Sequence, residues 1–129
     1  MRGVPPTAIH WARHAFHRVM DLPPDYDVLD LTGAPAAPRT SPFSVGRYDE
    51  DRAGMYTTPL FAGLRTVHVG IDLGAPAGTP VMAFAAGTLF AAGHNPADGD
   101  YGYVLVTEHR LDGVDLWALY GHLDERSVR

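Results

Sequence analysis

A histidine and an aspartate four residues apart, His68 and Asp72, are the residues whose types and spacing best suit chemistry in this sequence. Imidazole nitrogen and carboxylate oxygen both serve as zinc ligands in proteins. Only the small or apolar residues Val69, Gly70 and Ile71 stand between them. The pair therefore predicts part of a divalent-metal site; the alternative is a buried polar pair that serves structure alone.

The residues around this pair favour a strand that bends. Val67, Val69 and Ile71 are β-branched, and Gly70 would weaken a helix. In a strand, positions 68, 70 and 72 share one face. Four extended residues span about 13 Å, which is near the limit for sharing one metal ion. We therefore expect the chain to bend at Gly70, where glycine gives the backbone the most freedom.

Composition limits the class of protein and of site. With 129 residues, 46% of them hydrophobic and 19% charged, the chain is expected to form a soluble globular domain with a modest core. A net charge of -5 without a basic run disfavours nucleic acid as a partner. The sequence contains no cysteine, so a metal must be held by histidines and carboxylates.

No apolar run approaches the length that spans a membrane, and the N-terminus lacks the apolar core of a secretory signal. Membrane is therefore not an expected partner. On the sequence as given we expect a cytoplasmic protein, or an extracellular or cell-wall protein if the true N-terminus lies upstream.

Residues 8–20 are predicted to form a helix, because apolar residues recur there at helical spacing and Pro23 and Pro24 would stop it. The opposite face of this helix would carry His10, His14 and His17. Three histidines at this spacing could in principle bind a metal. A solvated polar face is the simpler interpretation, because Arg13 lies among them and would repel a cation.

The chain divides at about residue 64. Residues 1–63 are predicted to contain the helix and a long irregular linker rich in proline and glycine, with a short strand near residues 26–31. The charged stretch 47–50 in this linker is expected to be exposed and solvated. Residues 64–129 are predicted to form the main domain.

In that domain the sequence predicts a mainly β, antiparallel fold. Besides the strand through His68, the expected strands are 79–84, 87–92, 102–109 and 114–122. Residues 93–100 read as a loop by composition, and His94 within it is expected to be an exposed loop histidine, with the rim of a site as the alternative.

A hairpin is predicted at Asp112-Gly113, a strong signal for a two-residue turn. The register that follows places Arg110 opposite Asp115, His109 opposite Leu116, and Tyr103 opposite His122. His109 and His122 would then lie about 20 Å apart and could not share a site.

Five features occur in order: His68-x-x-x-Asp72, the run Gly74-Ala-Pro-Ala-Gly-Thr-Pro-Val81, a strand containing Gly87, Tyr101-Gly102 and Leu119-Tyr-Gly-His-Leu123. In this succession residues 64–129 resemble the lysostaphin-type zinc metalloendopeptidases, which hydrolyse peptide cross-links of bacterial cell walls. The resemblance implies an antiparallel duplicated-hybrid-motif sheet or sandwich.

The resemblance also implies roles for single residues. His68 and Asp72 correspond to two zinc ligands, and His122 corresponds to the catalytic histidine beside the metal-bound water. The third ligand in that family is the second histidine of a later His-x-His pair, and no such pair follows His122 here. We therefore expect a C-terminally truncated domain with an incomplete sheet and no activity alone.

Two other functions remain open. One is a degenerate copy that binds peptides or regulates a partner, which the missing His-x-His favours. The other is an accessory domain of a multidomain cytoplasmic aminotransferase-like enzyme, because the N-terminal helix and linker resemble such versions of the domain. The expected partners are a peptide or peptidoglycan substrate and further domains C-terminal to Arg129.

Overall fold

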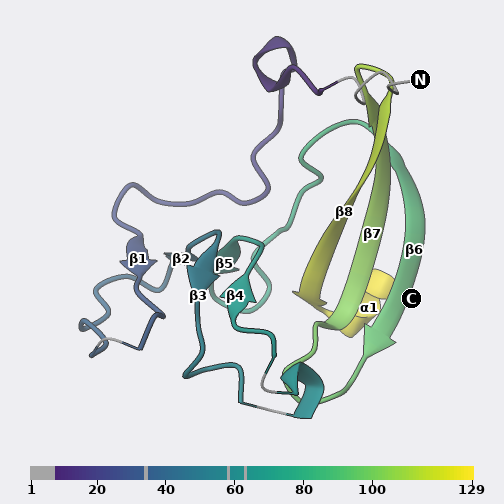
Figure 1. Ribbon diagram of the computed structural model, residues 1–129. Helices are drawn as coiled ribbons and strands as arrows, with labels where there is room; N and C mark the ends of the chain where they lie inside the picture. The colour runs from purple at the N-terminus through teal and green to yellow at the C-terminus, as the bar shows by residue number, and fades with distance from the viewer. Residues whose placement is uncertain (1–7, 34, 58, 63) are drawn as a thin grey trace, which may run out of the picture. The chain divides into compact units, whose positions relative to one another are not determined.

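A computed structural model of the protein describes residues 8–33, 35–57, 59–62 and 64–129 (Figure 1). The chain forms two compact units. One contains the described residues up to Val19 together with Met82–Pro96 and Asp100–Arg129, and the other contains Met20–Val81 and Ala97–Gly99. Among the described residues, no helix has the length and apolar character needed to cross a membrane.

The first unit is built on three long antiparallel strands in the order β6-β7-β8, which Figure 1 shows as one curved sheet. Their bounds are Thr88–Asn95 for β6, Gly102–Leu111 for β7 and Val114–Leu123 for β8. A short helix, α1 (Glu125–Val128), follows and is capped by Asp124, whose side chain accepts from the Arg126 amide.

These strands confirm the mainly β, antiparallel fold class and the predicted strands 87–92, 102–109 and 114–122. The strand predicted over 79–84 is wrong, because this stretch is not in a regular strand. The predicted loop at 93–100 begins later than expected, since β6 continues through His94 to Asn95.

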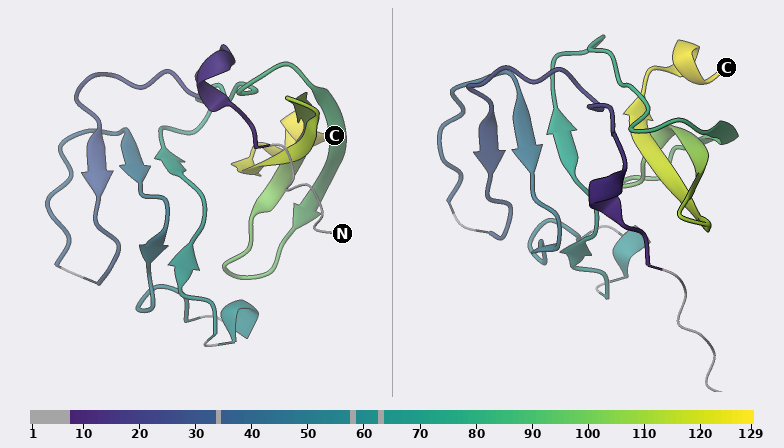
Figure 2. Two further views of the ribbon diagram at one scale, coloured as in Figure 1. Left: turned by 45° about the horizontal axis from the view of Figure 1, so that its top comes forward. Right: turned by 90° about the horizontal axis from the view of Figure 1, so that it is seen from above.

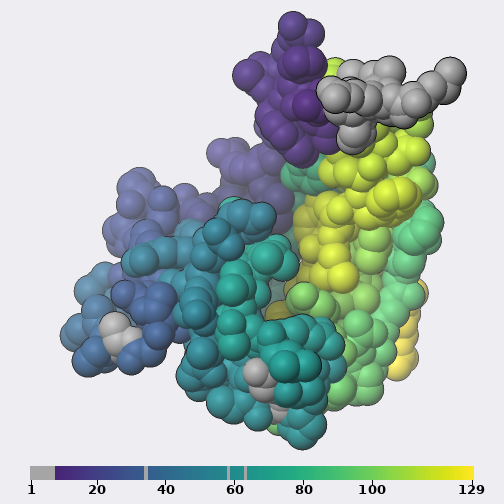
Figure 3. All heavy atoms as spheres, viewed as in Figure 1, coloured from purple at the N-terminus to yellow at the C-terminus, as the bar shows by residue number. Residues whose placement is uncertain are grey.

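The hairpin between β7 and β8 confirms the predicted turn. Asp112 and Gly113 have φ of 49° and 78°, as a two-residue turn that follows the twist of the strands requires. Arg110 lies opposite Asp115, and their side chains form an ion pair of 2.7 Å. Figure 3 draws all heavy atoms of this part of the chain as spheres, coloured green to yellow.

The predicted pairing of Tyr103 with His122 is wrong. Tyr103 pairs with Leu123 instead, because the register shifts between Tyr103 and Leu105. His122 has a φ of 56°, and its amide donates to the carbonyl of Tyr101 at 2.7 Å. An extra residue in one strand re-aims its side chain, and such bulges occur often beside functional sites.

His109 is a structural residue of this unit. It is 2% exposed, and its Nδ1 and Nε2 lie 2.8 Å from the carbonyl oxygen of Ala86 and 2.7 Å from the hydroxyl of Thr107. Both ring nitrogens therefore have partners. Gly87 makes room for it: a Cβ there would lie 2.4 Å from the Glu108 carbonyl oxygen and 2.6 Å from His109 Nδ1.

The helix predicted over 8–20 is wrong in extent, since only Trp11–Arg13 form a 3₁₀ turn. The following backbone is extended and pairs with a distant part of the chain. The amide of His17 donates to the carbonyl of Phe84, and the amide of Met82 donates to the carbonyl of Val19. These long-range bonds satisfy the backbone and replace the helical pattern.

The second unit contains two small sheets. In the first, β1 (Asp27–Leu29) is parallel to β2 (Ser44–Gly46), which is antiparallel to β5 (Asp72–Gly74) (Figure 2). In the second, β3 (Glu50–Asp51) is antiparallel to β4 (Val67–His68). A 3₁₀ turn spans Pro59–Phe61.

The short strand predicted near residues 26–31 is confirmed by β1, whereas β2 and β3 occur in a stretch predicted to be irregular. The domain boundary expected at residue 64 stays a prediction.

Replacing Gly87 by alanine is expected to destabilise the sheet by about 1–3 kcal/mol, because the added methyl would collide with backbone and with a fully bonded imidazole. Urea unfolding monitored by tryptophan fluorescence measures the change. Gly93→Ala in β6 is the matched control, since its Cβ would meet only Val104 at an ordinary 3.9 Å. Equal unfolding midpoints for the two variants would contradict this account.

Acid is expected to weaken the hairpin tip. A hydrogen bond from His14 and one from the His10 amide lower the pKa of the Asp112 carboxyl. The stabilisation is present above the unfolded pKa of about 3.9 and is lost as pH falls through the lower folded pKa. Asp112→Asn keeps a residue that tolerates positive φ but removes the charge. Thermal unfolding across acidic pH should therefore vary less in this variant than in the unaltered protein.

Candidate metal site

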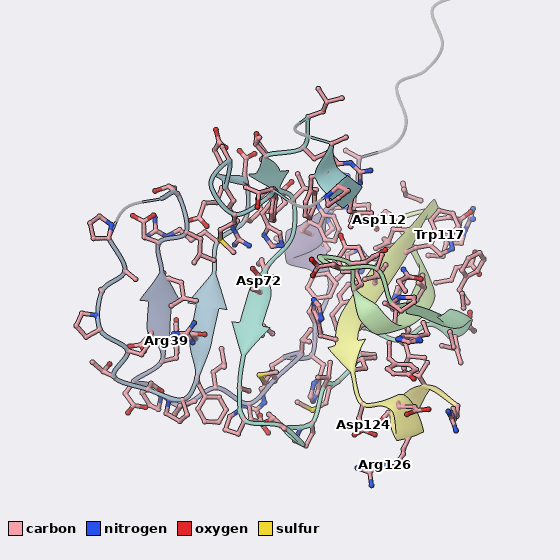
Figure 4. All side chains as sticks on the ribbon, turned by 90° about the horizontal axis from the view of Figure 1, so that it is seen from below. Arg39, Asp72, Asp112, Trp117, Asp124 and Arg126 are labelled. Atoms are coloured by element: carbon pink, nitrogen blue, oxygen red, sulfur yellow. The ribbon has the colours of Figure 1, made fainter. Side chains whose placement is uncertain are left out.

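His68 and Asp72 are brought together by a bend between two short strands. His68 ends β4 and pairs with Glu50 of β3, while Asp72 begins β5 and pairs with Gly46 of β2. The chain bends at Gly70, as predicted. As a result His68 Nε2 lies 3.3 Å from Asp72 Oδ1. Figure 4 labels Asp72 on β5.

The partner of Nδ1, the other ring nitrogen of His68, indicates which tautomer the ring adopts. Nδ1 lies 3.3 Å from the carbonyl oxygen of Arg47, which can only accept, so the proton belongs on Nδ1. In the neutral ring Nε2 then carries a lone pair. This lone pair lies 3.3 Å from Asp72 Oδ1, so a nitrogen and an oxygen that can each bind a metal ion stand side by side.

The spacing suits zinc. Two ligand atoms about 2.0–2.1 Å from a tetrahedral zinc ion lie about 3.3–3.4 Å apart, which agrees with the Nε2–Oδ1 distance. A carbonyl that accepts from the remote ring nitrogen is also what metal-binding histidines commonly have. A Cβ at position 70 would lie 3.4 Å from His68 Nε2, so glycine keeps this side of the ring open.

Asp72 is held from its other side by a buried ion pair. Arg52 Nη1 donates to Asp72 Oδ2 at 2.6 Å, and Arg52 Nε donates to Glu50 Oε1 at 2.9 Å. The side chains of Arg52 and Glu50 are 3% exposed, whereas that of Asp72 is 49% exposed. The guanidinium is therefore internal, and the carboxylate that it orients reaches the surface.

Electrostatics keep this guanidinium charged. Burial alone would lower the pKa of Arg52, but hydrogen bonds to Asp72 and Glu50 outweigh burial and raise that pKa above its ordinary value. Glu50 also accepts from the amide of Leu31 at 3.3 Å. Each charged group of this network therefore has a hydrogen-bond partner of opposite charge, as buried charges require.

The prediction that residues 47–50 form an exposed patch is wrong for Glu50, which is 5% exposed. Sequence reasoning also gave no role to Arg52. A signal was present, since the spacing Glu50-x-Arg52 puts opposite charges on one face of a strand. Nothing in that spacing indicated that both side chains would be buried.

The other predicted site residues lie in the first unit. His122 is exposed on β8, and its ring centroid lies 6.5 Å from that of Tyr101. Its convergence with His68 and Asp72 stays a prediction. His94 stacks on Tyr103, with centroids 3.9 Å apart, so it is a strand residue and not a loop residue.

The histidines predicted to share a helix face have separate roles. His14 pairs with Asp112 at 3.0 Å, and the ring of His17 bonds to the carbonyl of Arg18. Among the residues that the structure describes, no three histidines or carboxylates are grouped so that they could hold a metal ion.

The sequence model of peptidase family M23 matches residues 66–129, a range that includes His68, Asp72 and His122. No curated protein and no solved structure matches the chain.

Breaking the buried pair is expected to cost about 3–5 kcal/mol, because Arg52→Met leaves the Glu50 carboxylate buried without its cation. The double variant Arg52→Met/Glu50→Met should recover much of this loss, since both buried charges are then gone. Urea unfolding of the three proteins measures the difference. A double variant as unstable as Arg52→Met would show that the pair is not the source of the stability.

Proposed function

Since the chain belongs to peptidase family M23 through residues 66–129, we propose that its peptidase-like function is that of a zinc endopeptidase domain acting on peptide cross-links of bacterial cell walls. The observation that carries the proposal is the pair of lone-pair atoms, His68 Nε2 and Asp72 Oδ1, at a separation suited to one zinc ion.

The roles of the residues follow from their surroundings. His68 and Asp72 would hold the zinc ion, with Nδ1 of His68 anchored on the Arg47 carbonyl. Zinc in such a site polarises a carbonyl group and makes bound water acidic. His122 would take a proton from the attacking water or stabilise the oxyanion. The register shift beside His122, its positive φ and its exposed side chain support this role.

Two ligands are fewer than the three that a catalytic zinc ion normally has. Among the described residues, no third histidine or carboxylate is grouped with His68 and Asp72. With two ligands, zinc would be held weakly and its water poorly activated. We therefore propose that residues 1–129 alone have negligible peptidase activity.

A peptide-binding or regulatory role is the second candidate. The observation that favours it is the lack, among the described residues, of a group of three potential ligands. The two functions differ in their dependence on metal: hydrolysis needs zinc at His68 and Asp72, whereas peptide binding by a degenerate domain does not.

Zinc content after dialysis tests the site directly. The unaltered protein should bind zinc weakly, and His68→Ala and Asp72→Ala should each weaken binding by about tenfold or more, because each removes one of two ligands. His94→Ala is the control, since this histidine stacks on Tyr103 outside the pair.

Mass spectrometry of cell-wall cross-link peptides, incubated with the same proteins, measures cleavage. Zinc binding that is equal in all four proteins would refute the site. Zinc-independent binding of the peptides would favour the second candidate.

A further inference from the structure

The Arg52 guanidinium makes three hydrogen bonds that together fix its plane. Nη1 donates to Asp72 Oδ2 at 2.6 Å, Nε donates to Glu50 Oε1 at 2.9 Å, and Nη2 donates to the Arg47 carbonyl at 3.4 Å. The same carbonyl accepts from His68 Nδ1. Residues 47–52 therefore contact both predicted ligands: Arg52 bonds to Asp72, and the Arg47 carbonyl bonds to His68.

The hydrogen bond from Arg52 gives the two carboxylate oxygens of Asp72 different partners. Oδ2 is taken by Arg52, while Oδ1 faces His68 Nε2 at 3.3 Å. A carboxylate held in this way has one oxygen left for a metal ion. It also loses little rotational freedom when the metal binds.

A guanidinium beside a metal ligand also repels the metal ion. Glu50 offsets this repulsion, because its carboxylate lies 2.9 Å from Arg52 Nε and is as deeply buried as the guanidinium. Arg52 and Glu50 together are neutral. Arg52 can therefore hold the orientation of Asp72 without adding net positive charge beside the metal.

Gly46 is a separate sign that the backbone accommodates this contact. It lies opposite Asp72 in the β2–β5 ladder, and a Cβ there would lie 2.9 Å from Asp72 Oδ2 and 3.0 Å from Arg52 Nη2. A side chain at this position would push the two groups apart. Only glycine leaves space for the contact.

We propose that Arg52, with its charge balanced by Glu50, is a positioning residue that presents Asp72 to the metal through Oδ1 alone. The inference rests on the proposed metal site at His68 and Asp72. It adds a determinant of metal affinity and coordination that lies outside the ligand set. Lysine cannot replace Arg52, because an ammonium group lacks the planar fork that reaches Asp72, Glu50 and the Arg47 carbonyl together.

The test uses cobalt(II) as the probe, since its visible absorption reports both affinity and coordination. Arg52→Lys should lower cobalt affinity by about 10–100-fold, the usual cost of losing an outer-shell partner, and should alter the spectrum. Gly46→Ala should act in the same direction without changing any charge. Arg110→Lys is the matched control, because Arg110 makes a 2.7 Å pair with Asp115 on the exposed hairpin.

Affinity is compared at a denaturant-free condition in which circular dichroism shows each variant folded. Unchanged affinity and spectrum in Arg52→Lys would overturn the inference, and so would tighter binding, which would make Arg52 a competitor of the metal. If the variants do not fold, nitrogen-15 spectra of the unaltered protein are recorded with zinc in place of cobalt. The Arg52 guanidinium signals must stay protected from solvent exchange after zinc has bound.

The experiment distinguishes failure of the proposed metal site from failure of the inference about Arg52. Cobalt binding that His68→Ala leaves unchanged would overturn the metal site and this inference together. Binding that depends on His68 but not on Arg52 would overturn the inference alone.

Discussion

A buried guanidinium stands between two carboxylates in this protein, and the candidate site depends on it. Arg52 joins Glu50 of β3 to Asp72 of β5, and β3 pairs with the strand that ends at His68. These strands are two or three residues long, so their ladders alone supply few hydrogen bonds. The ion-pair network therefore adds the constraint that places one nitrogen and one oxygen atom 3.3 Å apart. The same network orients the half-exposed carboxylate of Asp72 through one of its two oxygens.

Features that depend on neighbouring residues, such as turns and bends, were predicted correctly from the sequence. The turn at Asp112-Gly113 follows from the φ values that these two residues tolerate, and it set the register of the adjacent pairs. The bend at Gly70 follows from the distance that two ligands of one metal must bridge. The selection of His68, Asp72 and His122 as site residues stays a prediction; the match to a peptidase family supports the resemblance on which it rests.

Long-range contacts account for what sequence reasoning missed. Arg52 and Asp72 are 20 residues apart, and no periodicity connects them. Burial of Glu50 depends on neighbours from other strands, so its charge suggested exposure. The predicted register paired every residue of one strand with one residue of the other, and the bulge beside His122 inserts an extra residue into β8. The apolar spacing in residues 8–20 indicated a helix, but backbone pairing with Phe84 and Met82 determined the outcome.

The proposed metal site requires one tautomer of His68, because only a ring with its proton on Nδ1 offers Nε2 to a metal ion. Long-range proton–nitrogen spectra of the imidazole rings distinguish the two nitrogens. We expect a His68 ring protonated on Nδ1, with an Nε2 signal that shifts when zinc is added while that of buried His109 stays in place. A His68 ring protonated on Nε2 and unaffected by zinc would contradict it.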